Sequence, residues 1–141
     1  MQQLMAISVF CEDIREEKKG TDTLVGIYPD NVNVPKFPCA FPRLALYTRV
    51  HLNPSYNPGE MSLFLRMPDG YEAKLTTFPK ELVEKATVDA NTASGPIAGL
   101  VSRAVAGSLR VQQAGRIVAI LRSATDEYII GSLNVQQTPK G

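Results

Sequence analysis

The sequence predicts a mainly-β fold, an antiparallel β-sandwich of about seven or eight strands with one inserted helix at about residues 80–91. Apolar and polar residues alternate with a period of two along most of the chain, which is the pattern of half-buried strands. These runs end at proline, glycine, asparagine and aspartate, at the short spacings of a sandwich. No succession of βαβ units appears, which disfavours a doubly wound nucleotide-binding fold.

The N-terminal part contains two short predicted strands. The first is 5–11, in which large apolar residues take every second position. The charged stretch 12–19 ends at Gly20 and is expected to be a solvated hairpin tip, with a docking patch as the alternative. The second strand is 24–28, and residues 32–34 are expected to continue it at a sheet edge before a proline.

The clearest alternation belongs to two central segments, 44–52 and 61–67. The connection 53–60 is rich in asparagine and in prolines, which cannot donate to a β-ladder. After the second segment, Pro68-Asp69-Gly70 supplies a turn before a further strand at 71–78. We expect 44–52 and 61–67 to be neighbouring antiparallel strands that share one core face.

One segment, 79–91, has helical periodicity. Pro79 stands near the start of the predicted helix, and Glu81 lies in its first turn. The apolar face comprises Leu82, Val83, Ala86 and Ala90. A helix of about three turns therefore fits this segment.

The C-terminal third begins with an ambiguous stretch, 97–106. Its apolar residues also match helical spacing: Ile97, Leu100, Val101 and Val105. We expect part helix here and then a strand from about Arg103 to Val111. The β-rich runs 117–121 and 128–135 are predicted to form a hairpin, and 138–141 are expected to be frayed.

Length and composition indicate one domain spanning 1–141. The chain has 141 residues and 44% hydrophobic content, so it can bury its own core. It carries 15 basic and 14 acidic residues, a net charge of +1, which argues against nucleic acid as a partner. Its apolar runs are too short to span a bilayer, and 1–10 has no basic region typical of a secretory signal.

The cysteine, histidine and acidic residues form no motif that indicates an enzyme. Cys11, Cys39 and His51 are isolated from one another, and the acidic pairs 12–13 and 126–127 are expected to be turn carboxylates in water, so no metal site is expected. His51 is the only histidine, and no nucleophile motif accompanies it. We expect no catalytic residue and no cofactor. Both thiols are expected to be reduced, which favours the cytoplasm of a bacterium or of a host infected by a virus.

The remaining functional candidate is a surface. If 44–52 and 61–67 are neighbours, their outer faces bring Tyr47, Arg49 and His51 beside Phe64 and Arg66. Aromatic and arginine side chains are enriched in interface cores, so this face is predicted to bind a protein partner or a second copy. The alternative is that the helix at 80–91 or a loop covers it.

Two segments at the ends of the chain resemble a known family. Cys11-Glu12-Asp13-Ile14-Arg15-Glu16 precedes Leu24-Val25-Gly26-Ile27-Tyr28, and the closing hairpin lies at 115–135. This pattern resembles a group of small bacterial proteins of unknown function, whose first strand reads C-D-D-I-R-x-E before an L-x-G-I-Y strand. Glu12 stands where aspartate is common in that group. The resemblance implies a small cytoplasmic β-sandwich, and it implies no activity, cofactor or catalytic residue.

These observations favour a non-enzymatic module that acts by protein–protein association or homo-oligomerisation. One alternative is a virus- or mobile-element-encoded inhibitor of a host or defence protein, although many such inhibitors are acidic and this chain is near neutral. A further alternative is a sandwich that binds sugars or small ligands, or a hydrolase built on one, with His51 and Tyr47 as its chemistry. A deep pocket at His51 lined by carboxylates would favour that alternative.

Overall fold

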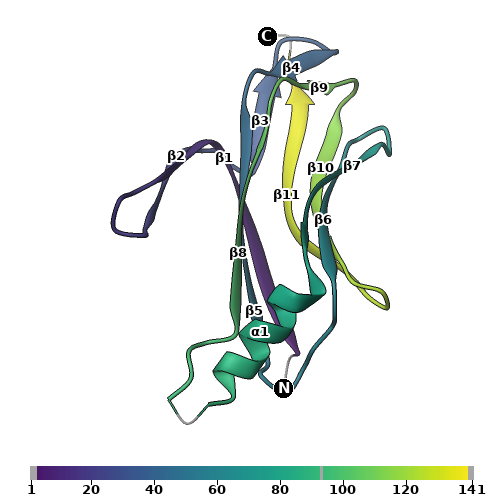
Figure 1. The fold of residues 1–141 in the computed structure, drawn as a ribbon. Coiled ribbons are helices and arrows are strands. Elements are labelled where there is room, and N and C mark those ends of the chain that lie inside the picture. The colour runs from purple at the N-terminus through teal and green to yellow at the C-terminus, as the bar shows by residue number, and fades with distance from the viewer. Residues whose placement is uncertain (1–2, 93, 140–141) are drawn as a thin grey trace.

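The computed structural model describes residues 3–92 and 94–139 and has a mainly-β, sandwich-like architecture, as predicted (Figure 1). Eleven strands and one helix lie in the described residues. The strands are β1 (Leu4–Glu16), β2 (Asp22–Ile27), β3 (Asn31–Val34), β4 (Cys39–Phe41), β5 (Leu44–Leu52), β6 (Met61–Arg66), β7 (Glu72–Phe78), β8 (Gly99–Ala106), β9 (Leu109–Val111), β10 (Gly115–Arg122) and β11 (Glu127–Gln137), and the helix is α1 (Lys80–Ala90).

The strands form two main sheets. Sheet A has the order β2-β1-β5-β8, and sheet B has the order β3-β11-β10-β6-β7. A small third sheet pairs β4 with β9. The pairing is antiparallel except between β3 and β11, so sheet B is mixed. The predicted strand count was too low because β3, β4 and β9 have only three or four residues each, too few for alternation to show.

The predicted pairing of the two central strands is wrong. β5 pairs with β1 and β8 in sheet A, whereas β6 pairs with β10 and β7 in sheet B. The connection 53–60 carries the chain from one sheet to the other. Two successive amphipathic strands can bury one face either side by side in a single sheet or opposite each other across a sandwich, and alternation alone does not distinguish these arrangements.

The core lies between the inner faces of the two sheets. The predicted inward faces of β5 and β6 are confirmed, and their buried apolar side chains are Leu44, Leu46, Val50, Leu52, Met61, Leu63 and Leu65. Ser8 and Thr48 are buried as well. Their hydroxyl oxygens are 2.7 Å apart, so each satisfies the other by a hydrogen bond.

The predicted helix is confirmed as α1, which connects β7 of sheet B to β8 of sheet A. Val83 is fully buried against the core, so α1 closes the side of the sandwich where these two strands end (Figure 1). The Asn91 side chain ends the helix by donating hydrogen bonds to the carbonyls of Thr87 and Pro54. Within the described residues, no helix is long and apolar enough to cross a membrane.

The expectation of part helix in 97–106 is wrong, because β8 is a strand throughout and β9 is a separate strand. Leu100 and Ser102 are buried on the inner face of β8, while Val101 and Val105 lie exposed on the outer face. Apolar residues on both faces of one strand produce spacings that match a helix.

The two ends of the chain also differ in part from expectation. The charged stretch does form a hairpin tip between β1 and β2, where Gly20 donates its N–H to the Glu17 carbonyl. Thr138 was expected to be frayed, but its N–H and hydroxyl both donate to the Val34 carbonyl. Residues 140–141 lie outside the described residues.

Gly131 of β11 allows the two sheets to approach closely at one side of the sandwich. A Cβ atom at this position would lie 3.0 Å from the Ser8 carbonyl oxygen and 3.2 Å from Ser8 Cβ. We therefore expect Gly131→Val to lower the free energy of unfolding by roughly 1–3 kcal/mol, since its branched side chain would force β11 away from β1. Chemical denaturation monitored by circular dichroism measures this change.

Gly107 provides the control, because a Cβ there would meet nothing within 4 Å. Gly107→Val should leave the free energy of unfolding nearly unchanged. Equal free energies of unfolding for the two variants would show that the close approach of β11 to β1 does not contribute to stability.

Candidate interaction surface

The residues of the predicted interaction face do not come together. Tyr47, Arg49 and His51 lie on β5 of sheet A, and Phe64 and Arg66 lie on β6 of sheet B. Because the buried faces of these strands oppose each other, their outer faces point to opposite sides of the sandwich. The prediction of a single patch made of these five residues is therefore wrong, and the two outer faces have to be considered separately.

The outer face of sheet B carries a network of two arginines and two glutamates. Arg66 Nε lies 2.8 Å from Glu72 Oε2, and Arg66 Nη2 lies 3.1 Å from Glu127 Oε1. Arg122 lies 3.2 Å from each of the same two carboxylates. The hydrogen bonds from Arg122 and Arg66 lower the pKa of the Glu72 carboxyl.

Contacts within this network satisfy Phe64 and Arg66, so neither side chain needs a protein partner. The Arg122 guanidinium carbon lies 4.5 Å from the centre of the Phe64 ring, which is a cation–π contact that partly covers the ring. Arg66 forms ion pairs with two carboxylates of its own chain. On the outer face of sheet B, the charges around Phe64 and Arg66 therefore neutralise one another, although the sequence predicted that these two residues bind a partner.

The outer face of sheet A has the opposite character. The register places Met5, Ile7 and Val9 of β1 beside His51, Arg49 and Tyr47 of β5, and it places Val101 of β8 beside Arg49 on the other side. Six large apolar side chains of this face are 38–62% exposed: Met5, Ile7, Val25, Ile27, Val101 and Val105. Together they expose on the order of 500 Å², at the upper end of what the largest apolar patch on a monomer covers.

The part of this face around Met5, Ile7, Arg49 and His51 is open to solvent, whereas the neighbouring residues Cys11 and Ala45 farther along it are fully buried. Met5 and Ile7 are 62% and 60% exposed, and Arg49 and His51 are exposed as well. Helix α1 packs at the side of the sandwich where β7 and β8 end, with Val83 in the core. The alternative in which the helix or a loop covers this face is therefore wrong for Arg49 and His51, which are exposed, while Tyr47 is half-buried.

The β1–β2 hairpin borders this face. Arg103 on β8 is separated from β1 by β5, yet its Nε lies 2.6 Å from Asp22 Oδ1 and 3.4 Å from Glu16 Oε1. The hairpin therefore bends over the outer face of sheet A, and Figure 1 shows it projecting from the sandwich on that side. Its acidic residue Asp13 is paired with Arg43 at 2.6 Å. In contrast, Arg49 forms no ion pair within the described residues.

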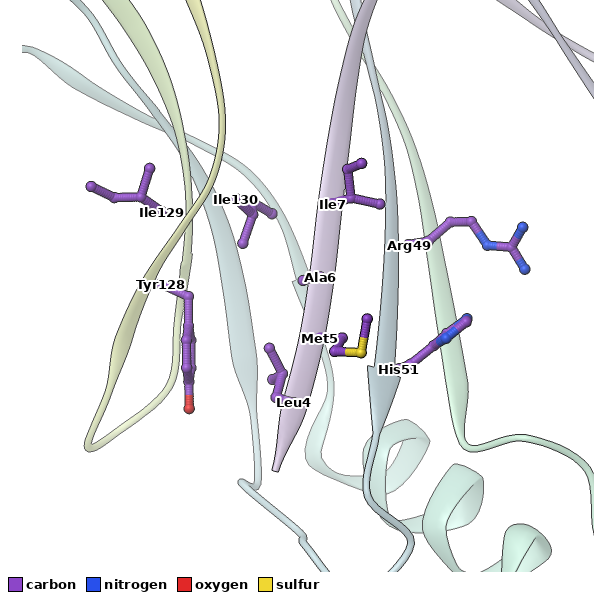
Figure 2. Close-up of a pocket in the computed structure, with 9 residues that line it drawn as sticks. All are labelled: Leu4, Met5, Ala6, Ile7, Arg49, His51, Tyr128, Ile129 and Ile130. Atoms are coloured by element: carbon purple, nitrogen blue, oxygen red, sulfur yellow. The ribbon is translucent and has the colours of Figure 1, made fainter. Parts of the chain in front are cut away.

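A depression of about 660 Å³ begins at this face and reaches the strand β11 of sheet B (Figure 2). The lining residues are Leu4, Met5, Ala6 and Ile7 of β1, Arg49 and His51 of β5, and Tyr128, Ile129 and Ile130 of β11. None of these residues is a carboxylate. The hydrogen bond with Tyr56 and burial raise the pKa of Tyr128 to about 12, so this phenol stays protonated at neutral pH.

This depression does not have the carboxylate lining that would favour the ligand-binding or hydrolase alternative. His51 has no carboxylate beside it in the lining, so the site holds no acid–base pair of the kind used in hydrolysis. Within the part of the chain that is described, no group of three or more His, Cys, Asp or Glu side chains could hold a metal ion. The lining is mainly apolar, and its polar side chains are Arg49, His51 and Tyr128.

Cys11 and Cys39 are both free thiols. Burial raises the pKa of each thiol, so both stay protonated at neutral pH and neither is activated as a nucleophile.

Sequence reasoning missed most of the apolar residues of this surface. Val101 lies in the part of 97–106 that is predicted from the sequence to be helical, and the alternation at 5–11 does not show which of its two faces is buried. The usable signal was that apolar residues occupy both faces of 4–11 and of 99–106. In an antiparallel sandwich, a strand with two apolar faces indicates that its outer face is covered by something.

The Glu72 carboxyl should make stability depend on pH at acidic values. Because its folded-state pKa lies below the ordinary value of 4.5, its contribution is present above that value and is lost as the pH falls through the folded-state pKa. We expect Glu72→Gln to lower the midpoint of urea unfolding at pH 7 and to have no effect at pH 2. Glu84→Gln on the exposed side of α1 is the control. A Glu72→Gln effect of equal size at both pH values would contradict the ion-pair explanation.

Comparison with known proteins identifies one relationship. A model of a family of unknown function (DUF6941) matches residues 6–134, which is most of the chain. Neither the curated proteins nor the solved structures contain a match. The matched residues include nearly all of sheets A and B and most of both outer faces described above, although Met5 precedes the match. On this match, the chain belongs to the DUF6941 family, a family of unknown function.

Proposed function

We propose that this protein is a non-enzymatic binding module that associates with another polypeptide through the outer face of sheet A. The observation that carries the proposal is the set of six exposed apolar side chains on one face of a four-stranded sheet. Antiparallel sheets that face water normally carry polar residues on that side. Exposed apolar area of this extent on one side typically marks an interaction site.

The contrast between the two sheets supports this proposal. Both sheets belong to one small domain, and both have a solvent-facing side. On sheet B that side carries Arg66, Arg122, Glu72 and Glu127, which satisfy one another, and a single strongly exposed large apolar side chain among the described residues, Ile129. On sheet A it carries valine, isoleucine and methionine around the exposed Arg49. Solubility alone would favour the sheet B pattern on both faces, so the apolar pattern of sheet A indicates a binding role.

A cytoplasmic location in a bacterium or in a virus-infected host belongs to the same proposal. Two free thiols with raised pKa values suit a reducing compartment. The inhibitor hypothesis would use the same surface, with a host or defence protein as the partner. Homo-oligomerisation is the other version, in which the partner is a second copy of the chain.

A paired-variant experiment tests the proposal. The double variant Ile7→Ser/Val101→Ser removes the two apolar side chains that flank Arg49. The control Tyr71→Ser/Val88→Ser removes two comparably exposed side chains that lie on the turn before β7 and on α1. Both variants should fold with nearly unchanged melting temperatures, because exposed side chains contribute little to stability. Light scattering and quantitative affinity capture from native cells are the measurements.

We expect wild type and the control to be recovered with one stoichiometric partner, or as an oligomer, and the Ile7→Ser/Val101→Ser variant to be recovered alone. The proposal fails if wild type is monomeric and captures nothing. It also fails if the two double variants retain the partner equally.

A further inference from the structure

The N-terminal half of β1 has an unpaired edge. β5 pairs with β1 over 4–11, whereas pairing with β2 begins only at Cys11. At the edge that faces β2, the Phe10 carbonyl accepts a hydrogen bond from the Tyr28 N–H. Since successive residues of a strand direct their backbone groups to alternate sides, Leu4, Ala6 and Ser8 direct theirs to the same edge as Phe10.

Strand β11 limits how much of this edge is open. Gly131 packs against the Ser8 carbonyl, and only a glycine fits at that distance without displacement. β11 does not pair with β1, because its own partners are β10 and β3. The open stretch of edge is therefore 4–7, in which the backbone N–H and C=O groups of Leu4 and Ala6 have no strand partner within the described residues.

The depression of about 660 Å³ runs along this edge. Four consecutive residues of β1, from Leu4 to Ile7, line it. Consecutive side chains of a strand point to opposite faces of the sheet, so one space that contacts all four has to lie alongside the strand. Across from β1, Tyr128, Ile129 and Ile130 of β11 also line the space, and Figure 2 shows Ile130 directed toward β1 and Ile129 directed away from it. The space is thus placed where a further strand of sheet A would lie.

The exposed segment also lacks the features that normally prevent edge pairing. Residues 4–9 read Leu-Met-Ala-Ile-Ser-Val, with no charge and no proline, and the β1–β5 register through them is continuous. Natural edge strands are usually blocked by lysine, proline, a bulge or a covering segment. An open, uncharged edge is the feature used by domains that bind peptides by strand addition.

The charges of the lining indicate the chemistry of the occupant. Arg49 and His51 line the depression, and none of its lining residues is acidic. A second copy paired along the same edge would place one set of these side chains on the β5 strand at each side of the seam and would supply no carboxylate from the lining residues. An added strand would lie about 10 Å from β5, a distance that an arginine and a glutamate side chain span together. An acidic residue in the occupant is therefore favoured over a second copy.

We propose that residues 4–7 of β1 accept an extended segment of another protein as an additional strand of sheet A, and that this segment carries an acidic residue among alternating apolar ones. This inference rests on the proposed function and names its partner class. Leu4 and Ala6 would contact the apolar side chains of the segment that point into the sandwich. Met5 and Ile7 would contact those that point outward, next to Arg49.

The experiment uses a randomised nine-residue peptide display library as the probe and the full chain as the target. The library should yield peptides with alternating apolar residues and at least one glutamate or aspartate. Synthetic copies of an enriched peptide are then N-methylated at one position at a time. N-methylation should weaken binding of the peptide roughly tenfold or more at every second residue, because only alternate N–H groups of the peptide face β1.

Two variants of the protein complete the test. Ala6→Pro removes a backbone donor that faces the open edge and leaves the β1–β5 ladder intact. Arg49→Gln removes the cation and should weaken peptides with glutamate more than matched peptides with glutamine. The N-methyl scan needs no variant, so the inference stays testable even if Ala6→Pro fails to fold.

Failure of this inference is distinguishable from failure of the proposed function. No enriched peptide, or N-methylation effects without a period of two, would overturn strand addition. A concentration-dependent dimer that Ala6→Pro abolishes would overturn it in favour of a second copy. If Ile7→Ser/Val101→Ser loses the native partner while Ala6→Pro keeps it, association through the outer face of sheet A stands and pairing at the edge does not.

Discussion

The packing of the inner face of β5 against the inner face of β6 is the constraint on which the rest of the structure depends. Both strands bury every second residue, all of them apolar except Thr48 of β5, and the chain crosses from sheet A to sheet B between them. This crossing determines which side chains face outward on each sheet. It separates Tyr47, Arg49 and His51 from Phe64 and Arg66 by the thickness of the sandwich, about 10 Å between sheets.

The two outer faces that result have opposite properties. Sheet B carries four charged side chains that neutralise one another above an aromatic ring, so this face is suited to water. Sheet A carries aliphatic side chains on β1, β2 and β8 around the basic residues of β5. The hairpin β1–β2 bends over this second face, and the adjacent edge of β1 is open. These three features of one region are the basis of the proposal that it contacts another polypeptide.

Much of the fold could be predicted from the sequence, because the period-two alternation of β5 and β6 and the helical period of α1 are strong local signals. The pairing of the strands could not be predicted. Residues 44–52 and 61–67 have the same alternating pattern whether they are neighbours in one sheet or lie opposite each other across the sandwich. The apolar outer face of sheet A was not predicted for a related reason. Val101 and Val105 lie opposite buried residues along β8, so a strand with two apolar faces was interpreted as part helix. The open edge depends on where β2 starts to pair, which no local pattern of β1 reveals.

The central claim is that the outer face of sheet A is covered by a polypeptide in the cell. Hydroxyl-radical labelling tests it most directly, because Met5 lies on that face with 62% exposure and methionine is readily oxidised. The labelling of Met5 should be compared between purified protein and protein in intact native cells, with the exposed Tyr71 as the internal reference. We predict that Met5 is labelled strongly in the purified protein and is protected in cells while Tyr71 is labelled equally in both. Equal labelling of Met5 in the two samples would contradict the claim.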